Sequence, residues 1–173
     1  YKLLILAQPS LNLEDAYEAC RKETAQWAKT FYLGTMLLPP AKRKAIWAIY
    51  VWCRRTDELM DSTEAQKKSR NELSDRLNKW EDKTKNIFAG KTEDDLDAVL
   101  ADTLQKFPQS IQPYLDMIEG QRMDLDTTRY KTFEELELYC YRVAGTVGLM
   151  TQGVIGIDCL LYTSDAADDV NGV

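Results

Sequence analysis

Apolar residues recur every three or four positions along most of this chain, and that spacing is typical of amphipathic helices. No run of alternating apolar and polar residues is long enough to indicate a strand. Caps, prolines and glycines divide the pattern into six predicted helices. They span residues 12 or 13 to 33, 39 or 40 to 61, 65–88, 92–106, 114–125 and 132–155. The sequence therefore predicts an all-α fold in a single domain.

Local chemistry at a few residues sets these predicted boundaries. Asn12 is a candidate N-cap because two acidic residues follow it in the first turn. Pro40 suits the first turn of the second helix, where its missing N–H has no partner to lose. Ser62 or Thr63 can cap the third helix, and Gly90 can end it.

Composition narrows the class of protein. The 173 residues are 45% hydrophobic and 29% charged, which leaves enough apolar mass for a core. The net charge of −6 does not favour nucleic acid as a partner. No stretch of 18 apolar residues occurs, so we expect no membrane span. The chain begins at Tyr1 and not at Met, so we expect any start codon and targeting peptide to be missing.

The chain contains four cysteines, Cys20, Cys53, Cys140 and Cys159, and no histidine. No cysteine pair has the C-x-x-C spacing, which argues against a zinc site. The first three lie in apolar helical contexts, so we expect buried, reduced thiols. Without histidine, this piece cannot contain a Ser-His-Asp or Cys-His mechanism. Carboxylates, metal ions, tyrosine and arginine remain as candidates for chemistry.

One stripe of the second predicted helix concentrates such groups. Tyr50, Arg54, Asp57 and Asp61 fall within about 60° of one another on a helical projection. The preceding residues are apolar nearly all round, so the helix should be buried, and buried carboxylates need compensation. Two carboxylates one turn apart can share Mg²⁺ with a substrate phosphate, and an arginine can bind diphosphate oxygens. Alternatively, Arg54 simply pairs with acidic residues three and four positions later.

Two further blocks carry unusual residues. Residues 139–148 read as helix yet contain two glycines, and Ala144 and Gly148 share one face. That face favours either tight helix packing or an apolar ligand. In the block at residues 116–124, Asp116 and Asp124 share a face with a glycine between them, and spacing alone favours an amphipathic helix with a solvated edge.

Together these blocks resemble the phytoene/squalene synthase family. The resemblance rests on residues 29–32, 38–39, 43–50 and 53–61, whose last five residues, Asp57–Asp61, match the first aspartate-rich motif. It rests also on residues 139–148 and on residues 119–125 with 129–130. The sequences of these segments are closer to those of plant and algal phytoene synthases than to those of squalene synthases. The match covers about residues 14–158.

The resemblance implies the all-α class I isoprenoid (terpenoid) synthase fold. It implies a head-to-head condensation of two geranylgeranyl diphosphates, through the cyclopropyl prephytoene diphosphate, to phytoene in carotenoid biosynthesis. Magnesium or manganese would act as Lewis acid on the departing diphosphate, in a cavity that keeps water from a carbocation.

The resemblance also assigns roles to individual residues. Asp57 and Asp61 match the catalytic, metal-binding aspartates. The matches to the substrate diphosphate site are Tyr50, Arg54, Thr30 and Phe31. The matches to the prenyl cavity are Tyr139, Val143, Ala144, Val147 and Gly148. Asp116 and Asp124 receive no metal role.

The sequence also departs from the family pattern. The second aspartate-rich motif is absent, so residues 1–158 are expected to form part of a synthase domain that is inactive alone. Residues 159–173 resemble a translated sequencing adapter, and we expect this tail not to be natural protein.

Other interpretations stay open from the sequence: a squalene synthase-like enzyme, a non-catalytic family member that serves as an assembly partner, or an unrelated helical bundle. The resemblance implies a plastid location for a plant or algal source and a cytoplasmic one for a bacterial source. It is compatible with peripheral membrane contact, since substrate and product are apolar. It leaves the oligomeric state open.

Overall fold

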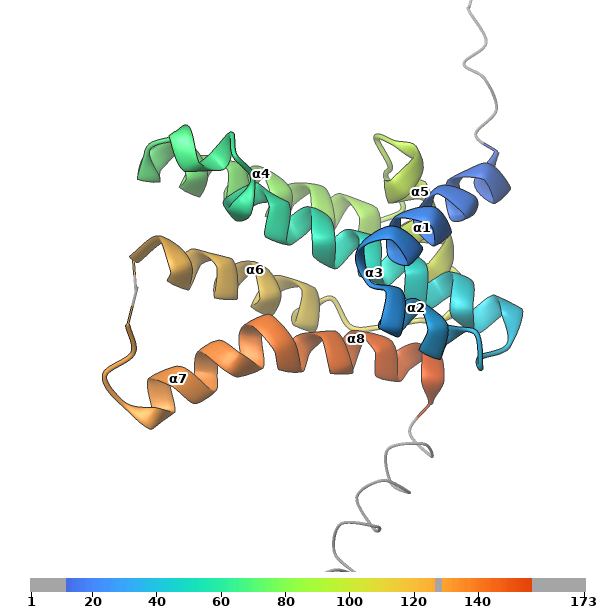
Figure 1. The fold of residues 1–173 in the computed structure, drawn as a ribbon. Helices are drawn as coiled ribbons and strands as arrows, with labels where there is room; N and C mark the ends of the chain where they lie inside the picture. The colour runs from blue at the N-terminus through green and yellow to red at the C-terminus, as the bar shows by residue number, and fades with distance from the viewer. Residues whose placement is uncertain (1–11, 127–128, 157–173) are drawn as a thin grey trace, which may run out of the picture.

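The computed structural model describes residues 12–126 and 129–156, and these residues form helices with no strand among them (Figure 1). None of the helices in this part of the chain is long and apolar enough to cross a membrane. The elements in chain order are α1 (Leu13–Trp27), α2 (Lys29–Thr35), α3 (Pro40–Asp61), the 3₁₀ turn η1 (Ala65–Lys67), α4 (Arg70–Phe88), α5 (Asp95–Lys106), α6 (Gln112–Asp126), α7 (Phe133–Cys140), the π-helical turn η2 (Tyr141–Gly145) and α8 (Thr146–Ile155).

Helix α3 lies at the centre of the bundle and packs against α1, α4, α5, α6 and α8. It begins at Pro40 and ends at Asp61, which confirms the predicted second helix. Its middle, residues 45–53, is buried except for Tyr50, as its apolar composition predicted. Trp52 stacks on Trp80 of α4 at 6.0 Å between ring centroids and meets Tyr114 of α6 edge-on at 4.7 Å. Burying side chains of this size contributes roughly 1.5–3 kcal/mol each.

The first predicted helix is two helices in the structure. Asn12 is the N-cap, as predicted, and its side chain accepts from the Glu14 N–H at 3.2 Å. The prediction of one helix to residue 33 is wrong, because Ala28 leaves the helical region at φ −135° and ψ 64°. The break turns α2 so that Tyr32 stacks on Trp47 of α3 at 5.8 Å. Packing against α3 therefore outweighs the local helical preference.

The third and fourth predicted helices start later than the sequence suggested. Ser62 is the C-cap of α3, and its Oγ accepts a hydrogen bond from the N–H of Ala65, the first residue of η1. Ser69 is the N-cap of α4 and Asp94 that of α5, each in a reciprocal capping box with an acidic residue three positions on. Gly90, at φ +77°, follows the end of α4 as predicted, since that backbone conformation suits glycine.

The last predicted helix is continuous but not regular. Thr132 caps α7, as predicted, and its hydroxyl accepts from the Glu135 N–H. The turn η2 separates α7 from α8 and packs against α6. A Cβ on Gly120 of α6 would lie 2.9 Å from Val143 Cγ1 and 3.0 Å from Arg142 Cβ, so this close approach requires glycine. On the Asp116–Asp124 face of α6, Gly120 is therefore packed against η2, whereas Asp116 is half-buried and Asp124 is exposed, which leaves the predicted solvated edge at the ends of that face.

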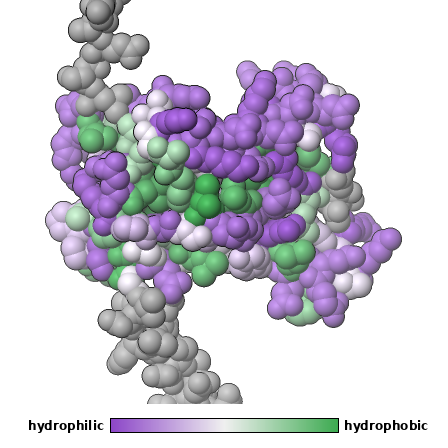
Figure 2. All heavy atoms as spheres, turned by 180° about the vertical axis from the view of Figure 1, so that it is seen from behind, coloured by the Kyte–Doolittle hydropathy of each residue, from purple (hydrophilic) through white to green (hydrophobic). Residues whose placement is uncertain are grey.

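Exposed apolar side chains gather on α2, in the turn after it, and on α7. They include Leu37 in that turn, which is 90% exposed, and Phe133 of α7, which is 73% exposed. Figure 2 shows the face opposite to that of Figure 1, where apolar residues form a central band between hydrophilic regions. Cys20 and Cys53 are buried free thiols, as expected, but Cys140 is exposed, so its predicted burial is wrong.

Candidate active site

The stripe predicted on α3 is present and only partly accessible. Tyr50, Arg54 and Asp57 are half-buried, and Asp61 at the end of the helix is exposed. The helix keeps these four side chains on one face because they recur every three or four residues. The same helix buries its apolar residues in the core. The polar stripe and the buried apolar residues therefore occupy different sides of α3.

Asp57 is the most perturbed carboxyl of this stripe. Its Oδ1 accepts a hydrogen bond from Nε2 of Gln121 on α6 at 2.9 Å, and Gln121 is buried. Burial, and then the negative charge of Asp61, raise the pKa of Asp57 to about 6, although Arg54 opposes the shift. Asp124 adds to the same effect. A bound cation would relieve this accumulation of negative charge.

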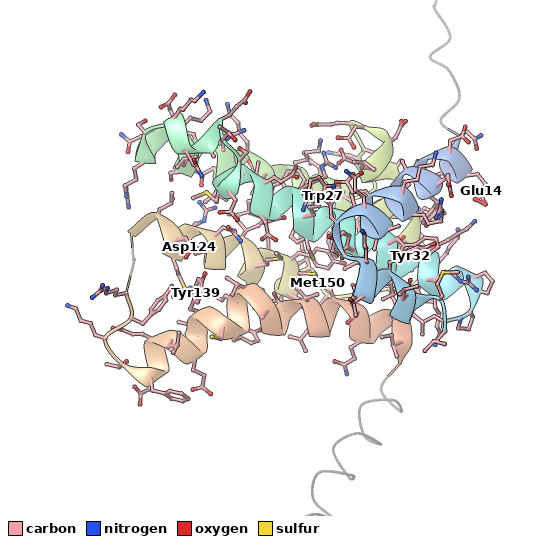
Figure 3. The ribbon with its side chains drawn as sticks, viewed as in Figure 1. Glu14, Trp27, Tyr32, Asp124, Tyr139 and Met150 are labelled. Carbon is pink, nitrogen blue, oxygen red and sulfur yellow. The ribbon has the colours of Figure 1, made fainter. Side chains whose placement is uncertain are left out.

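Asp124 brings α6 into the site from the opposite side. Its Oδ2 accepts a hydrogen bond from the Tyr139 hydroxyl of α7 at 3.3 Å, and Figure 3 shows the two side chains facing each other. Burial and the charge of Asp61 raise the pKa of Asp124, while the bond from Tyr139 lowers it. Burial, followed by Asp124, raises the pKa of Tyr139 to about 12. The Tyr139 ring also packs on Tyr130 at 4.9 Å.

Arg54 is held by partners other than the two aspartates. Its Nη2 donates to Glu58 at 2.8 Å, Nε lies 3.5 Å from Glu23, and the guanidinium lies 4.0 Å from the Trp27 ring centroid. The pairing with Glu58 is the one that ordinary helix spacing predicted. The buried Nε makes no hydrogen bond among the described residues, although it lies in ion-pair range of Glu23.

The residues predicted from the first block lie beside the stripe. Phe31 of α2 stacks on Tyr50 at 5.6 Å, so the structure brings these two predicted residues together. Burial raises the pKa of Tyr50, and Arg54 lowers it. Thr30 is exposed. An apolar pocket of about 280 Å³ lies next to Phe31, lined also by Gly34, Thr35, Leu38, Ile46, Thr151 and Ile155.

The five residues predicted for a prenyl cavity lie along α7, η2 and α8. Tyr139, Val143 and Val147 are half-buried, whereas Ala144 and Gly148 are exposed. No atom lies within 4 Å of a Cβ placed on Gly148, so tight helix packing there is not observed. This face has room for a ligand.

The carboxylates are suited to a divalent cation but do not complete a site. Within residues 12–126 and 129–156, no group of three or more Cys, Asp and Glu side chains is arranged to hold a metal ion. Asp57 and Asp61 offer hard oxygen ligands, and Mg²⁺ commonly takes one or two carboxylates together with substrate phosphates. The uncompensated charge at Asp57 fits such a cation.

Sequence reasoning missed two residues of this region. Gln121 follows Met117 and Ile118 at helical spacing, and all three are buried. A polar residue on an apolar face was the signal that could have found it. Asp124 was noted but given no role, because nothing in the local sequence shows that α6 faces α3 and α7.

Comparison with known proteins identifies the family and the fold of the chain. The squalene/phytoene synthase family model matches residues 24–170, and the chain belongs to this family. That match ends inside the segment 159–173, whose origin as an adapter stays a prediction. A solved dehydrosqualene synthase is similar, with 32% identity, a TM-score of 0.72, and coverage of 82% of this chain and 48% of that one. A squalene synthase from Alicyclobacillus acidocaldarius has 26% identity, a TM-score of 0.73, and coverage of 82% and 52%. The predicted isoprenoid synthase fold is confirmed.

Curated relatives narrow the resemblance. A 15-cis-phytoene synthase from Synechocystis sp. is 60% identical over 152 residues, which cover 88% of this chain and 44% of that protein. A chloroplastic phytoene synthase from Narcissus pseudonarcissus is 55% identical over 145 residues, which cover 84% of this chain and 33% of that protein. The chain spans between a third and a half of the length of these relatives.

Proposed function

We propose that the protein is a phytoene synthase, which condenses two geranylgeranyl diphosphates head to head and forms phytoene through prephytoene diphosphate. The observation that carries this proposal is the cluster of Asp57, Asp61 and Asp124 at the edge of an all-α bundle, where burial and then the charge of Asp61 raise the pKa of Asp57 in spite of Arg54. Perturbed carboxylates in such a place are typical of functional sites. Phytoene synthases with 55–60% identity support the choice of substrate.

Each residue of the site has a part in this proposal. Asp57 and Asp61 would hold magnesium or manganese, which supplies Lewis acidity to a leaving diphosphate. Arg54 would bind diphosphate oxygens through its guanidinium, and Tyr50 would donate a hydrogen bond beside it. Thr30 and Phe31 form the adjoining wall of the diphosphate site.

The apolar chain of the substrate would lie along the accessible face of α7, η2 and α8. The residues beside it would be Tyr139, Val143 and Val147, which are half-buried, and Ala144 and Gly148, which are exposed. Small residues at two of these positions leave space, and the neighbouring apolar side chains exclude water from a carbocation.

The described chain would supply one part of the catalytic domain. In support, its relatives are two to three times as long, and its two α3 aspartates do not make a metal site alone. We propose that a second aspartate-rich motif faces α3 in the whole protein, and that the 173-residue chain is inactive by itself.

The place of the enzyme in the cell depends on its source. The relatives from plants are named as chloroplastic, which supports a plastid location if the source is a plant or an alga. A bacterial source would make the enzyme cytoplasmic. The apolar substrate and product support peripheral contact with a membrane.

The test is a product assay on the full-length protein. The coding sequence beyond residue 158 is recovered from the transcript, which also shows whether residues 159–173 are natural. The purified protein receives geranylgeranyl diphosphate or farnesyl diphosphate, with Mg²⁺ or with EDTA. A metal-dependent C40 product supports the proposal, and a C30 product from farnesyl diphosphate alone indicates a squalene synthase-like enzyme. No product from either substrate, in a folded protein, indicates a non-catalytic relative.

A further inference from the structure

We propose that Asp124 is a positioning residue for Tyr139, and that it orients the phenol toward the aspartate pair of α3 without being a third metal ligand. The proposal rests on the proposed function, since it names what sets the geometry of that site. It starts from the 3.3 Å hydrogen bond between the Tyr139 hydroxyl and Asp124 Oδ2.

Helix α6 connects the two sides of the site through neighbouring side chains. Gln121 and Asp124 are three residues apart, so they lie on adjoining parts of one face. Gln121 donates to Asp57 of α3 at 2.9 Å, and Asp124 accepts from Tyr139 of α7. One rigid helix therefore fixes both a carboxylate of the aspartate pair and the phenol opposite to it.

The close contact between α6 and η2 fixes where Tyr139 lies relative to α6. Gly120 has no Cβ, which lets the backbone of Arg142 come within 3.3 Å of where that atom would be. A π-helical turn at residues 141–145 inserts into the regular helix directly after Tyr139. Such turns often occur at functional sites, because they shift the register of the side chains on either side.

Two observations favour positioning over metal ligation by Asp124. Asp57, Asp61 and Asp124 influence one another electrostatically, yet no three acidic groups among the described residues are arranged to hold a metal. Asp124 also already has a donor, the Tyr139 hydroxyl. A carboxylate that accepts from a tyrosine holds that ring in one orientation, as outer partners of a reactive site do.

The structure contains a matched control pair. The Tyr141 hydroxyl of η2 donates a hydrogen bond to Asp116 Oδ2 of α6 at 3.0 Å. Asp116 lies two helical turns before Asp124, and no shift in Asp57 or Asp124 is traced to it. A variant that lacks this hydrogen bond therefore loses a Tyr–Asp contact of the same kind, but away from Asp57 and Asp61.

The experiment measures kcat and KM of the full-length enzyme with geranylgeranyl diphosphate and Mg²⁺. The variants are Tyr139→Phe, Asp124→Ala, Asp124→Asn, and the double variant Tyr139→Phe/Asp124→Ala. We expect Tyr139→Phe and Asp124→Ala each to lower kcat about 10–100-fold with little change in KM. The double variant should be no worse than either, because the two residues act as one unit. Asp124→Asn keeps an acceptor oxygen and should stay within about three-fold of the wild type.

Other outcomes overturn the proposal. If Asp124→Asn is as poor as Asp124→Ala, and its effect multiplies with that of Tyr139→Phe, then Asp124 acts through its charge, as a metal ligand would. If Asp124→Ala is within two-fold of the wild type, it has no role. The variants Tyr141→Phe and Asp116→Ala should retain wild-type kcat. An equal loss there would mean that any contact between α6 and η2 matters.

A second readout does not depend on activity. Tyrosine labelled with ¹³C at Cζ reports the hydrogen bonding of each phenol by NMR, and Tyr139→Phe assigns the signal. We expect Asp124→Ala to shift the Tyr139 signal and Asp116→Ala to leave it unchanged. If the wild-type enzyme makes no product but Asp124→Ala still shifts the Tyr139 signal, the proposed function is wrong and the positioning of Tyr139 by Asp124 stands. An unchanged signal removes the positioning whatever the activity.

Discussion

Helix α3 borders two charged regions that differ in one respect, the presence of a positive partner. On one side, Arg55 donates to Asp94 at 2.7 Å and to Asp97 at 3.1 Å. Lys83 of α4 reaches the same two carboxylates at 2.9 and 3.0 Å. Asp97 is 1% exposed, and this network ties α3, α4 and α5 together with two positive partners for each of Asp94 and Asp97.

On the other side of α3, the carboxylates of Asp57, Asp61 and Asp124 make no salt bridge with a lysine or an arginine of the described chain. Asp57 and Asp61 face Asp124, while Arg54 is occupied by Glu58 and Trp27. The effect on pKa is opposite in the two regions. Burial raises the pKa of Asp57 to about 6, whereas at Asp94 the hydrogen bonds from Lys83, the Asp97 backbone and Arg55 overcome burial and lower the pKa.

The comparison separates two uses of a half-buried carboxylate. A balanced network stabilises helix packing, and its cost of desolvation is offset within the fold. An unbalanced group keeps an unfavourable charge that a cation or substrate can satisfy. Two residues apart on α3, Arg55 belongs to the first region and Asp57 to the second, because successive residues face different sides of the helix.

The largest expected effect is on activity, in the unbalanced region. Asp57→Ala or Asp61→Ala in the full-length enzyme should lower kcat/KM about 10³-fold or more, because several kcal/mol of metal-assisted stabilisation are lost. A steady-state assay of phytoene formation measures this effect. Circular dichroism should show an unchanged fold. A variant with near-normal turnover would remove these aspartates from the reaction.

The next effect is on stability, in the balanced region. Asp97→Ala leaves Arg55 and Lys83 without a buried partner, and we expect it to lower the free energy of unfolding by about 3–5 kcal/mol. Urea titration measures the change, with an unchanged slope as the sign of an unchanged fold. Asp57→Ala is the control, since it removes a carboxylate whose pKa is raised by burial and by Asp61 in spite of Arg54. If both variants were equally destabilised, the distinction between the regions would be lost.

A third effect concerns pH. Because the fold raises the pKa of Asp57 from 3.8 to about 6, folded protein binds more protons than unfolded protein between these values. This group therefore makes the protein less stable as pH rises from about 4 to about 6. The stability of Asp57→Asn, relative to wild type, should increase over that range and then level off. Parallel curves from urea titrations at several pH values would contradict this, and excess Mg²⁺ should reduce the difference.

The smallest effect comes from an exposed ion pair. Lys85 lies 2.6 Å from Glu81 on α4, and half of its side chain is exposed. Lys85→Ala should leave the free energy of unfolding almost unchanged, since solvent screens such pairs. Thermal denaturation measures it. A loss comparable to that of Asp97→Ala would show that burial does not separate strong pairs from weak ones here.

Much of the site was predictable because it lies on one helix. The stripe from Tyr50 to Asp61 follows from helical periodicity alone, and α3 has the predicted bounds. Other boundaries were missed where two signals competed. Ser62 and Ser69 are both good caps, and only the reciprocal bond with Glu72 selected Ser69 for α4.

The sequence by itself determined the helical class, the position of α3 and the carboxylates on its accessible face, because spacing along one helix is a local property. Only the tertiary structure decided that α1 breaks at Ala28, that Cys140 is exposed, and that Asp124 meets Tyr139. These features depend on which helices lie side by side. Helix pairing is set by the packing of surfaces far apart in sequence, which no local pattern records.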